Sequence, residues 1–391
     1  MFYIFNNIKK KYIFDSFVNA LDTEYKNEFL SNITNFALEL GISGNIWQKY
    51  LLYVLIFNDN PYTRQIERRH VDNVLELARL DLKEYYRLYN IKRDFMESII
   101  NFNFPVKKTE VAIALDELES KIDLNYESFE KEILGFYENT GLAFMSLYKA
   151  FRVLDGNLSP IYNILNVGFD DLIGYDYQKE LLINNTLDFI NDRPANNVLL
   201  YGDSGTGKST SIKALINTYF KDGLRIIEVY KHQMEEISKI VNTLRNRPYH
   251  YIIYMDDLSF EEDEIEYKYL KSVIEGGIEP KPSNVLIYAT SNRRHLIKET
   301  TEDNMGSDLH RNETEAEKLS LAYRFGLQIF YSNLSPMEFK DMVIKLAKKN
   351  NLKLDEKTLL SEANMWQLTY GSLSGRCATQ FINYISNKYI K

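Results

Sequence analysis

The chain has 391 residues, of which 45% are hydrophobic and 26% are charged, and its formal net charge is -8. This length favours two or three domains, and the composition excludes disordered and fibrous classes. The acidic balance argues against a protein whose main task is to grip nucleic-acid phosphates. The single cysteine, Cys377, excludes an intrachain disulfide framework and a cysteine-built zinc site, and we expect a cytoplasmic protein.

The amino-terminal part, residues 1–155, shows helical periodicity with few turn residues. Its apolar residues recur at helical spacing, for example at Val71, Val74, Leu75, Ala78 and Leu82. The most apolar window, 46–57, is interrupted by Gln48 and Lys49 and is too short to span a membrane, so it predicts a buried helix. We predict an all-helical domain of unknown role, and we expect no membrane partner.

Residues 156–175 contain one proline and three glycines and predict a linker to a second domain, 176–334. Short apolar runs alternate there with amphipathic patterns: Val198–Tyr201, Arg225–Tyr230, Tyr251–Met255, Val285–Ala289 and Leu327–Tyr331. Unalternating runs are typical of buried parallel strands, and the helices between them indicate βαβ units. We predict an α/β fold with a five-stranded parallel sheet. A helical subdomain, 335–391, follows and begins at a capping box formed by Ser335 and Glu338.

The first apolar run is followed by GDSGTGKS, which matches the phosphate-binding loop pattern, and then by a helical stripe. Glycines let backbone N–H groups turn toward phosphate oxygens, and the start of a helix adds partial positive charge. Lys208 is expected to reach the β and γ phosphates, and the Ser209 hydroxyl to ligate Mg²⁺. The residues predicted to hold ATP in this loop are Gly202, Asp203, Ser204, Gly205, Thr206, Gly207, Lys208, Ser209 and Thr210.

Two acids, Asp256 and Asp257, end the third apolar run in the sequence YIIYMDD. Carboxylates at the end of a buried strand can hold Mg²⁺ through its water shell, and we predict this role for Asp256. Asp257 is predicted to be the catalytic base that polarises the attacking water, with Glu261 or Glu262 as alternatives. The competing explanation is that these acids only cap the next helix.

Three further residues are candidates for contact with the γ-phosphate. Asn292 ends the fourth apolar run, where an amide can orient water, although a Ser-Asn pair after a strand is also common in turns. Arg324 lies just before the last run, and Arg376 lies at the head of the last predicted helix. A lone arginine is more often a surface residue in an ion pair, so the order of motifs along the chain is needed to assign either one a catalytic role.

In chain order, GDSGTGKS, YMDDLSF, ATSNR, YRFG and SGRC resemble Walker A, Walker B, sensor 1, the arginine finger and sensor 2 of the AAA+ ATPases. The similarity covers about residues 168–391, and the DDLSFE run resembles a bacterial AAA+ family described only as a domain of unknown function. The resemblance implies a helical lid, with ATP held between it and the sheet and with Ile173 and Gly174 near the adenine. It implies that Arg376 senses the γ-phosphate in its own subunit. It also implies that Arg324 completes a neighbour's site, and therefore a homo-oligomeric ring or partial ring.

The chain departs from the AAA+ pattern in three places. Asp257 replaces the usual Walker B glutamate, which weakens the expectation of fast hydrolysis. The connection Lys231–His250 has no aromatic-apolar-glycine pore loop, so protein unfolding by threading is unsupported. The polar segment Lys298–Glu317 is longer than a minimal turn and is either a partner loop or mobile.

Three functional hypotheses follow. The first is an oligomeric ATPase that hydrolyses Mg-ATP to remodel or load a protein partner recruited by residues 1–155. The second is an ATP-gated switch or scaffold with slow or no hydrolysis, and the third, the least supported, is a P-loop kinase. Nucleic acid stays open as a partner but unsupported, because Arg293, Arg294 and His295 are the local basic cluster and three residues decide nothing.

Overall fold

The computed structural model describes residues 2–21, 25–67, 74–105, 107–261, 264–275, 281–294, 296 and 321–389. The chain divides into two compact units, of which unit 1 comprises Met1–Tyr148 with Asn246–Pro248, and unit 2 comprises Lys149–Arg245 with Tyr249–Lys391. Within the described ranges, no helix is both long and apolar enough to cross a membrane.

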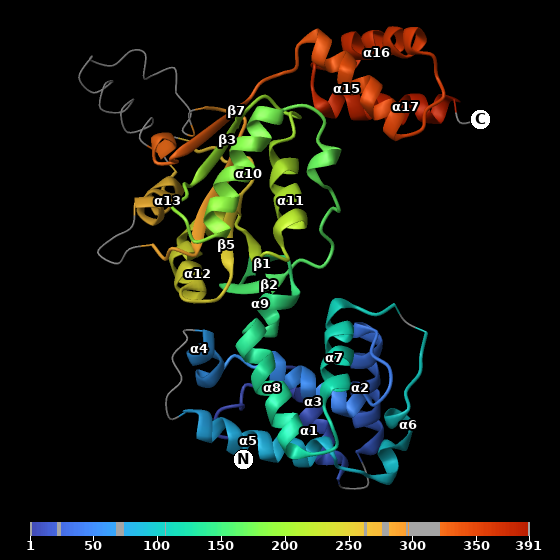
Figure 1. The fold of residues 1–391 in the computed structure, drawn as a ribbon, viewed down its shortest axis with the longest axis vertical. Helices are drawn as coiled ribbons and strands as arrows, with labels where there is room; N and C mark the ends of the chain where they lie inside the picture. Colours follow the sequence, from blue (N-terminus) through green and yellow to red (C-terminus); the bar gives the residue numbers. More distant parts are fainter. Residues whose placement is uncertain are drawn as a thin grey trace. The chain divides into compact units, whose positions relative to one another are not determined.

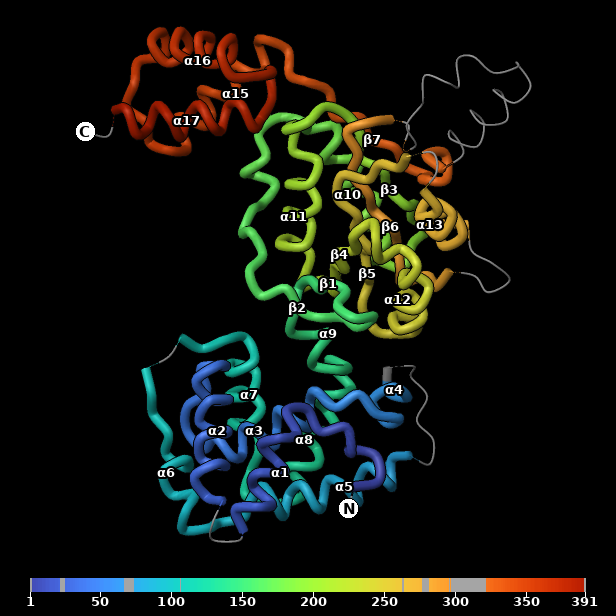
Figure 2. Tube along the Cα trace, turned by 180° about the vertical axis from the view of Figure 1, so that it is seen from behind, coloured from blue at the N-terminus to red at the C-terminus, as the bar shows by residue number. Residues whose placement is uncertain are grey.

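Unit 1 is built from helices around one aromatic-rich core. The helices are α1 (Lys11–Ala20), α2 (Lys26–Leu40), α3 (Ile46–Ile56), α4 (Pro61–Glu67), α5 (Val74–Tyr89), η1 (Asp94–Met96), α6 (Glu97–Ile100), α7 (Glu110–Lys121), α8 (Tyr126–Thr140) and α9 (Ala143–Leu147). Helix α3 contacts α2, α5, α6, α7 and α8, and Figure 2 shows it among them. Every residue of α3 except Gln48 and Tyr53 is buried, so the predicted buried helix is confirmed.

Unit 2 contains a mostly parallel sheet, and the α/β class predicted from the sequence is confirmed. Its strands are β1 (Ala150–Leu154), β2 (Asn157–Pro160), β3 (Val198–Gly202), β4 (Leu224–Glu228), β5 (His250–Met255), β6 (Val285–Ser291) and β7 (Leu327–Tyr331). They lie in the order β2-β1-β4-β5-β6-β3-β7, and only the β1–β2 pair is antiparallel. The five parallel strands from β3 to β7 correspond to the five predicted runs.

The predicted count of five strands is wrong, because the described sheet has seven. The additional hairpin β1–β2 lies at the expected border between the helical domain and the linker, and it adds to the edge of β4. Its turn has Asp155 and Gly156 at φ 49° and 69°, the left-handed geometry for which an Asp-Gly pair is a strong hairpin signal. The strands have only 5 and 4 residues, and the second ends in Pro160, which an edge strand tolerates. Such short segments, interrupted by glycine and proline, resemble a linker in composition, which is why the sequence did not indicate two further strands.

Helices cover both faces of the sheet, which explains why its strands do not alternate between apolar and polar residues. Figure 1 shows α10 (Asp176–Ile190) and α11 (Lys208–Tyr219) on one side, and α12 (Ile237–Leu244) and α13 (Glu266–Glu275) on the other. One core joins α10 and α11 to every second strand residue, such as Ile252 and Tyr254 of β5. Because the strands are parallel, the residues that follow β3, β5 and β6 meet at the same edge of the sheet.

The carboxyl-terminal helices form a lid with a core of its own. They are α15 (Pro336–Lys349), α16 (Glu356–Tyr370) and α17 (Gly375–Tyr389). The predicted capping box is confirmed at the start of α15, where Ser335 Oγ accepts from Glu338 N (3.2 Å) and Glu338 Oε2 accepts from Ser335 N (2.8 Å). The lid core also contacts the partly buried side chains of Ile173 and Tyr175, so it packs on the segment that precedes α10.

Candidate functional site

The loop between β3 and α11 is shaped by glycines at positions where no other residue fits. Gly202 has φ 133°, and a Cβ there would lie 2.0 Å from the carbonyl oxygen of Tyr331. Gly207 has φ 97°, and a Cβ there would lie 2.9 Å from Cδ1 of Leu172. The first N–H groups of a helix have no intrahelical acceptor, so the start of α11 presents donors to whatever the loop encloses. This is the geometry of an anion cradle.

Lys208 is the first residue of α11, and its side chain lies beneath the loop with only 6% of the residue exposed. Its Nζ donates to the carbonyl oxygens of Gly202 (2.8 Å) and Asp203 (2.7 Å) and to Oδ1 of Asn292 (3.1 Å). Burial lowers the pKa of Lys208, and nearby carboxylates oppose that shift. The cation is therefore placed between the loop and the end of β6, with partners that a phosphate oxygen can replace.

Asp256 follows β5 and receives two hydroxyl groups on one carboxylate oxygen. Its Oδ1 accepts from Ser209 Oγ (2.7 Å) and from Thr290 Oγ1 (2.6 Å). Burial acts to raise the pKa of Asp256, but the hydrogen bonds outweigh it, and the pKa lies below its ordinary value. A serine hydroxyl beside an ionised carboxylate is a set of hard oxygen donors, which suits Mg²⁺.

Asp257 and Asn292 are joined by a hydrogen bond. Asn292 Nδ2 donates to Asp257 Oδ1 (2.7 Å), while Asn292 Oδ1 accepts from Lys208. The amide can face only one way here, because a lysine only donates and a carboxylate only accepts. Asp257 itself has φ 50°, a left-handed conformation that is uncommon outside glycine and is most often seen for Asn and Asp. The structure thus brings the predicted base and the predicted sensor residue together.

A cavity of about 700 Å³ lies at this edge of the sheet, bounded by the loop, the acids and the lid. The predicted site residues that line it are Ile173, Ser204, Gly205, Thr206, Gly207, Lys208, Ser209, Thr210, Asp256, Asp257, Asn292 and Arg376. Gly202, Asp203, Gly174 and Arg324 were also predicted but do not line it. Asp203 still supports the loop from behind, because its Oδ2 accepts from Asn333 N (3.0 Å).

The lid reaches the cavity through the first turn of α17. The N–H of Arg376 donates to Gly205 O (3.0 Å), and its Nη1 donates to Ser204 Oγ (3.4 Å). A Cβ at Gly205 would lie 2.9 Å from Cβ of Arg376, so glycine is also required where the lid touches the loop. The guanidinium therefore lies beside the β3–α11 loop of its own chain.

The segment before α10 forms an apolar wall of the cavity. Ile173 lines it with Leu172 and Tyr175, and Lys179 Nζ donates to Leu172 O (3.0 Å), which holds the backbone there. Gly174 turns this segment with φ 83° and faces Met342 of the lid. An apolar wall next to a backbone segment can hold the flat face of a base.

Arg324 lies away from the cavity of its own chain. Its Nε is paired with Oε1 of Glu275 at the end of α13. Its Nη1 is buried and has no hydrogen-bond partner among the described residues. The guanidinium therefore has hydrogen-bond partners for only part of its N–H groups, and it does not line the cavity of its own chain.

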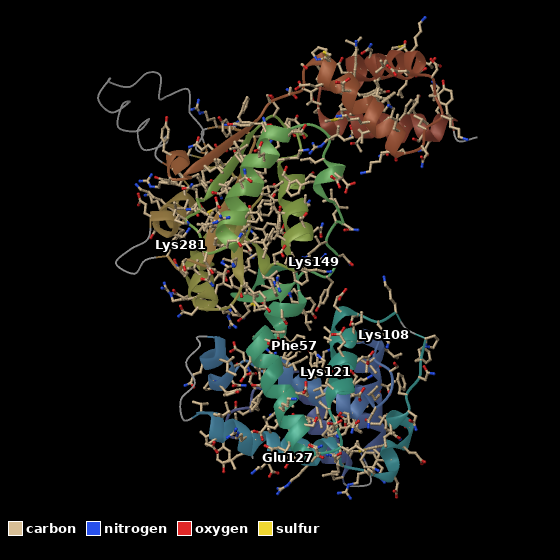
Figure 3. The ribbon with its side chains drawn as sticks, in the orientation of Figure 1. Phe57, Lys108, Lys121, Glu127, Lys149 and Lys281 are labelled. Carbon is tan, nitrogen blue, oxygen red and sulfur yellow. The ribbon has the colours of Figure 1, made fainter. Side chains whose placement is uncertain are left out.

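Several other candidates do not belong to the cavity. Glu261 is absent from its lining, and its N–H donates to Glu264 Oε2 (3.0 Å). Glu262, His295 and Lys298–Glu317 lie outside the described residues. Lys281, labelled in Figure 3, was not a candidate from the sequence. Burial lowers its pKa to about 8, but it donates to Asn197 Oδ1 (2.8 Å) and is absent from the lining, so its role is structural.

Sequence reasoning missed ten residues of the lining. They are Asp171, Leu172, Tyr175, Lys213, Thr290, Met342, Leu346, Gly375, Thr379 and Gln380. Thr290 is the one with a visible signal, because it is a hydroxyl residue near the end of an apolar strand and two positions before Asn292. The lid residues carry no such signal in the sequence, because their local pattern does not show which face of a helix contacts the loop.

The family model described as "Protein of unknown function (DUF815)" matches residues 146–389. The resemblance to a family of unassigned task, drawn from the motif after the third strand, is thereby confirmed. No curated protein matches the chain.

Among solved structures, two variants of Thermotoga maritima RuvB share 16% and 17% identity, each with a TM-score of 0.39. The matches cover 56% of this chain and only 64% and 65% of those chains. The Thermotoga maritima RuvB Holliday junction branch migration motor shares 14% identity at a TM-score of 0.35, with 56% of this chain and 71% of that chain covered. Likenesses this loose say nothing about what this chain does.

Proposed function

The chain belongs to the DUF815 family of unknown function, and from that premise and its own cavity we propose that it is a magnesium-dependent AAA+ ATPase that works as a homo-oligomer. One observation carries the proposal. A phosphate-type loop, a buried lysine, two acids, an amide and a lid arginine all line the same cavity of about 700 Å³. Each of these groups is of the type that phosphoryl transfer from a nucleotide requires.

Nucleotide binding follows from the loop and the apolar wall. The N–H groups at the start of α11 and the Lys208 ammonium supply donors for the phosphates, while Leu172 and Ile173 cover the base. Ser209 and Asp256 fit Mg²⁺, which when bound neutralises charge on the phosphate oxygens. The glycines leave no room for side chains in the cradle, as the contact at Gly207 illustrates.

Hydrolysis is assigned to Asp257. Its carboxylate accepts a proton from water as the water oxygen bonds to the γ-phosphorus, and the bond from that phosphorus to the bridging oxygen of ADP breaks. Asn292 holds the carboxylate at 2.7 Å, and Arg376 beside the loop stabilises charge on the phosphates from the same chain. Arg324 acts in a neighbouring subunit, in keeping with its place outside its own cavity. Unit 1 recruits the protein partner on which the oligomer acts.

An ATP-gated switch with slow turnover is the second candidate, and the backbone of Asp257 favours it. The aspartate is shorter than a glutamate, its φ of 50° is left-handed, and its Oδ1 already accepts from Asn292 Nδ2. A switch would bind Mg-ATP with one nucleotide per site and release little phosphate. A kinase, in contrast, would need an acceptor, so phosphate release by the chain alone excludes it as the main activity.

Steady-state phosphate release by the full chain, with Mg²⁺ and with excess EDTA, tests the proposal. We expect release that requires Mg²⁺ and that rises per subunit with protein concentration, because assembly completes the sites. ATP binding without release would select the switch. A chain that binds no nucleotide under either condition would refute the assignment altogether.

Asp257→Asn is expected to bind Mg-ATP as tightly as the wild type and to lower turnover about 100-fold or more, because the base is lost while the bond to Asn292 can be kept. The matched control is Glu261→Gln, which changes the nearby acid that does not line the cavity. Turnover and equilibrium binding of labelled ATP are measured on both. Loss of turnover in the Glu261 variant, with normal turnover in the Asp257 variant, would show that the base is misassigned.

A further inference from the structure

Thr290 is the residue of β6 that touches both acids of the cavity. Its Oγ1 donates to Asp256 Oδ1 (2.6 Å) and accepts from the N–H of Asp257 (2.9 Å). Its carbonyl oxygen also accepts from the N–H of Leu258 (2.7 Å). One residue therefore holds three successive residues that follow β5.

The sheet brings Thr290 close to the two acids. In the parallel β5–β6 pair, Met255 lies opposite Ala289, and the next residue along the chain is Asp256 after β5 and Thr290 within β6. Thr290 is 1% exposed, so its hydroxyl is enclosed by protein, whereas the two acids that it contacts are exposed. The 2.6 Å bond to Asp256 has the length of a charge-assisted hydrogen bond, which is among the stronger kinds.

The direction of the two hydrogen bonds is fixed by the atoms involved. The N–H of Asp257 can only donate, so the threonine oxygen accepts there, and its single proton must go to Asp256. The Ser209 hydroxyl donates to the same Oδ1 (2.7 Å), so neither hydroxyl occupies Oδ2. The hydroxyl thus orients the Asp256 carboxylate while it pins the left-handed backbone of Asp257.

We propose that Thr290 is a positioning residue that couples the two acids, setting the carboxylate for the magnesium side and the backbone of the base with one hydroxyl. The inference rests on the proposed ATPase site and adds the group that orients it. It distinguishes Thr290 from Ser291, its buried neighbour, whose hydroxyl donates to Leu258 O (2.7 Å) and contacts neither acid.

The test compares Thr290→Val, Thr290→Ser and Ser291→Ala in the full chain. Valine has the shape of threonine without the hydroxyl, serine restores the hydroxyl, and Ser291→Ala removes a hydroxyl that steadies the same turn. The readout is the dissociation constant of a slowly hydrolysed ATP analogue, measured with MgCl₂ and again with EDTA. The dissociation constant in EDTA divided by the constant in MgCl₂ gives the factor by which magnesium strengthens binding. This ratio separates the contribution of magnesium from that of the loop.

We expect Thr290→Val to reduce this ratio about 10- to 100-fold with little change in EDTA, since loss of a group that orients a metal ligand typically has this effect. Thr290→Ser should recover most of the ratio, and Ser291→Ala should keep it even if its melting temperature falls.

Equal weakening with and without Mg²⁺, or a ratio in Thr290→Val like that of the wild type, would overturn the inference. If the wild type binds Mg-nucleotide without hydrolysis, the ratio still decides the role of Thr290 and only the ATPase fails. If it binds none, both proposals fall.

Discussion

Lys208→Ala is expected to weaken ATP binding about 100-fold or more and to abolish phosphate release. The Nζ group now lies among two loop carbonyls and Asn292 Oδ1, all acceptors within 3.1 Å, and the same position serves phosphate oxygens. Each charge-assisted hydrogen bond to an ammonium contributes about 1.5–3 kcal/mol, so two lost bonds suffice for this effect. Equilibrium binding of a fluorescent ATP analogue measures the first change, and a phosphate assay the second.

Two controls separate loss of function from loss of structure. Lys221→Ala removes an exposed lysine just beyond the end of α11 and should bind ATP like the wild type. Thermal unfolding of Lys208→Ala should show a folded chain, because the loop keeps its glycines and alanine is a good helix former. Wild-type affinity in a folded Lys208→Ala protein would contradict the proposed site.

The parallel sheet could be predicted because strands buried on both faces are apolar at consecutive positions, and such runs are visible in the sequence. The runs that became β3, β5 and β6 are apolar at nearly every position, and each is followed at once by polar residues, so their limits agree with the structure to within two residues. The hairpin β1–β2 was missed because an edge pair is short and shares its composition with a linker. Its Asp155-Gly156 turn was the signal that should have been used.

The candidate site divides in the same way. Residues in one contiguous motif, such as Lys208 and Ser209, are predictable because their roles depend on the backbone beside them. The contacts of Thr290 depend instead on the register between two strands that are distant in sequence, so its place near a strand end indicates the cavity but not its bonds to both acids. The lid contacts from α15 and α17 depend on how a separate core packs, so Met342 and Gln380 could be found only in three dimensions.

Arg324→Ala is expected to leave ATP binding intact and to lower turnover about 1000-fold, the scale on which an arginine supplied in trans acts. The guanidinium does not line its own cavity, and the role that we propose for it is in a neighbouring subunit. Binding of an ATP analogue and steady-state phosphate release are measured together. The control Arg193→Ala removes a surface arginine paired with Asp188 (3.0 Å) and should change neither.

Because Arg324 is also paired with Glu275, a fall in turnover could come from the broken ion pair alone. Glu275→Gln breaks the pair and keeps the arginine, so it should retain turnover if the guanidinium acts on the neighbour's phosphate.

Mixing the Lys208→Ala and Arg324→Ala proteins gives the decisive result. Lys208→Ala subunits are expected to bind ATP weakly and release no phosphate but still carry Arg324, whereas Arg324→Ala subunits are expected to bind ATP but lack this arginine. A mixture of the two inactive proteins should therefore regain turnover at sites where they adjoin. A silent mixture, or normal hydrolysis by Arg324→Ala alone, would mean that each chain completes its own site, and the argument for an obligatory oligomer would be lost.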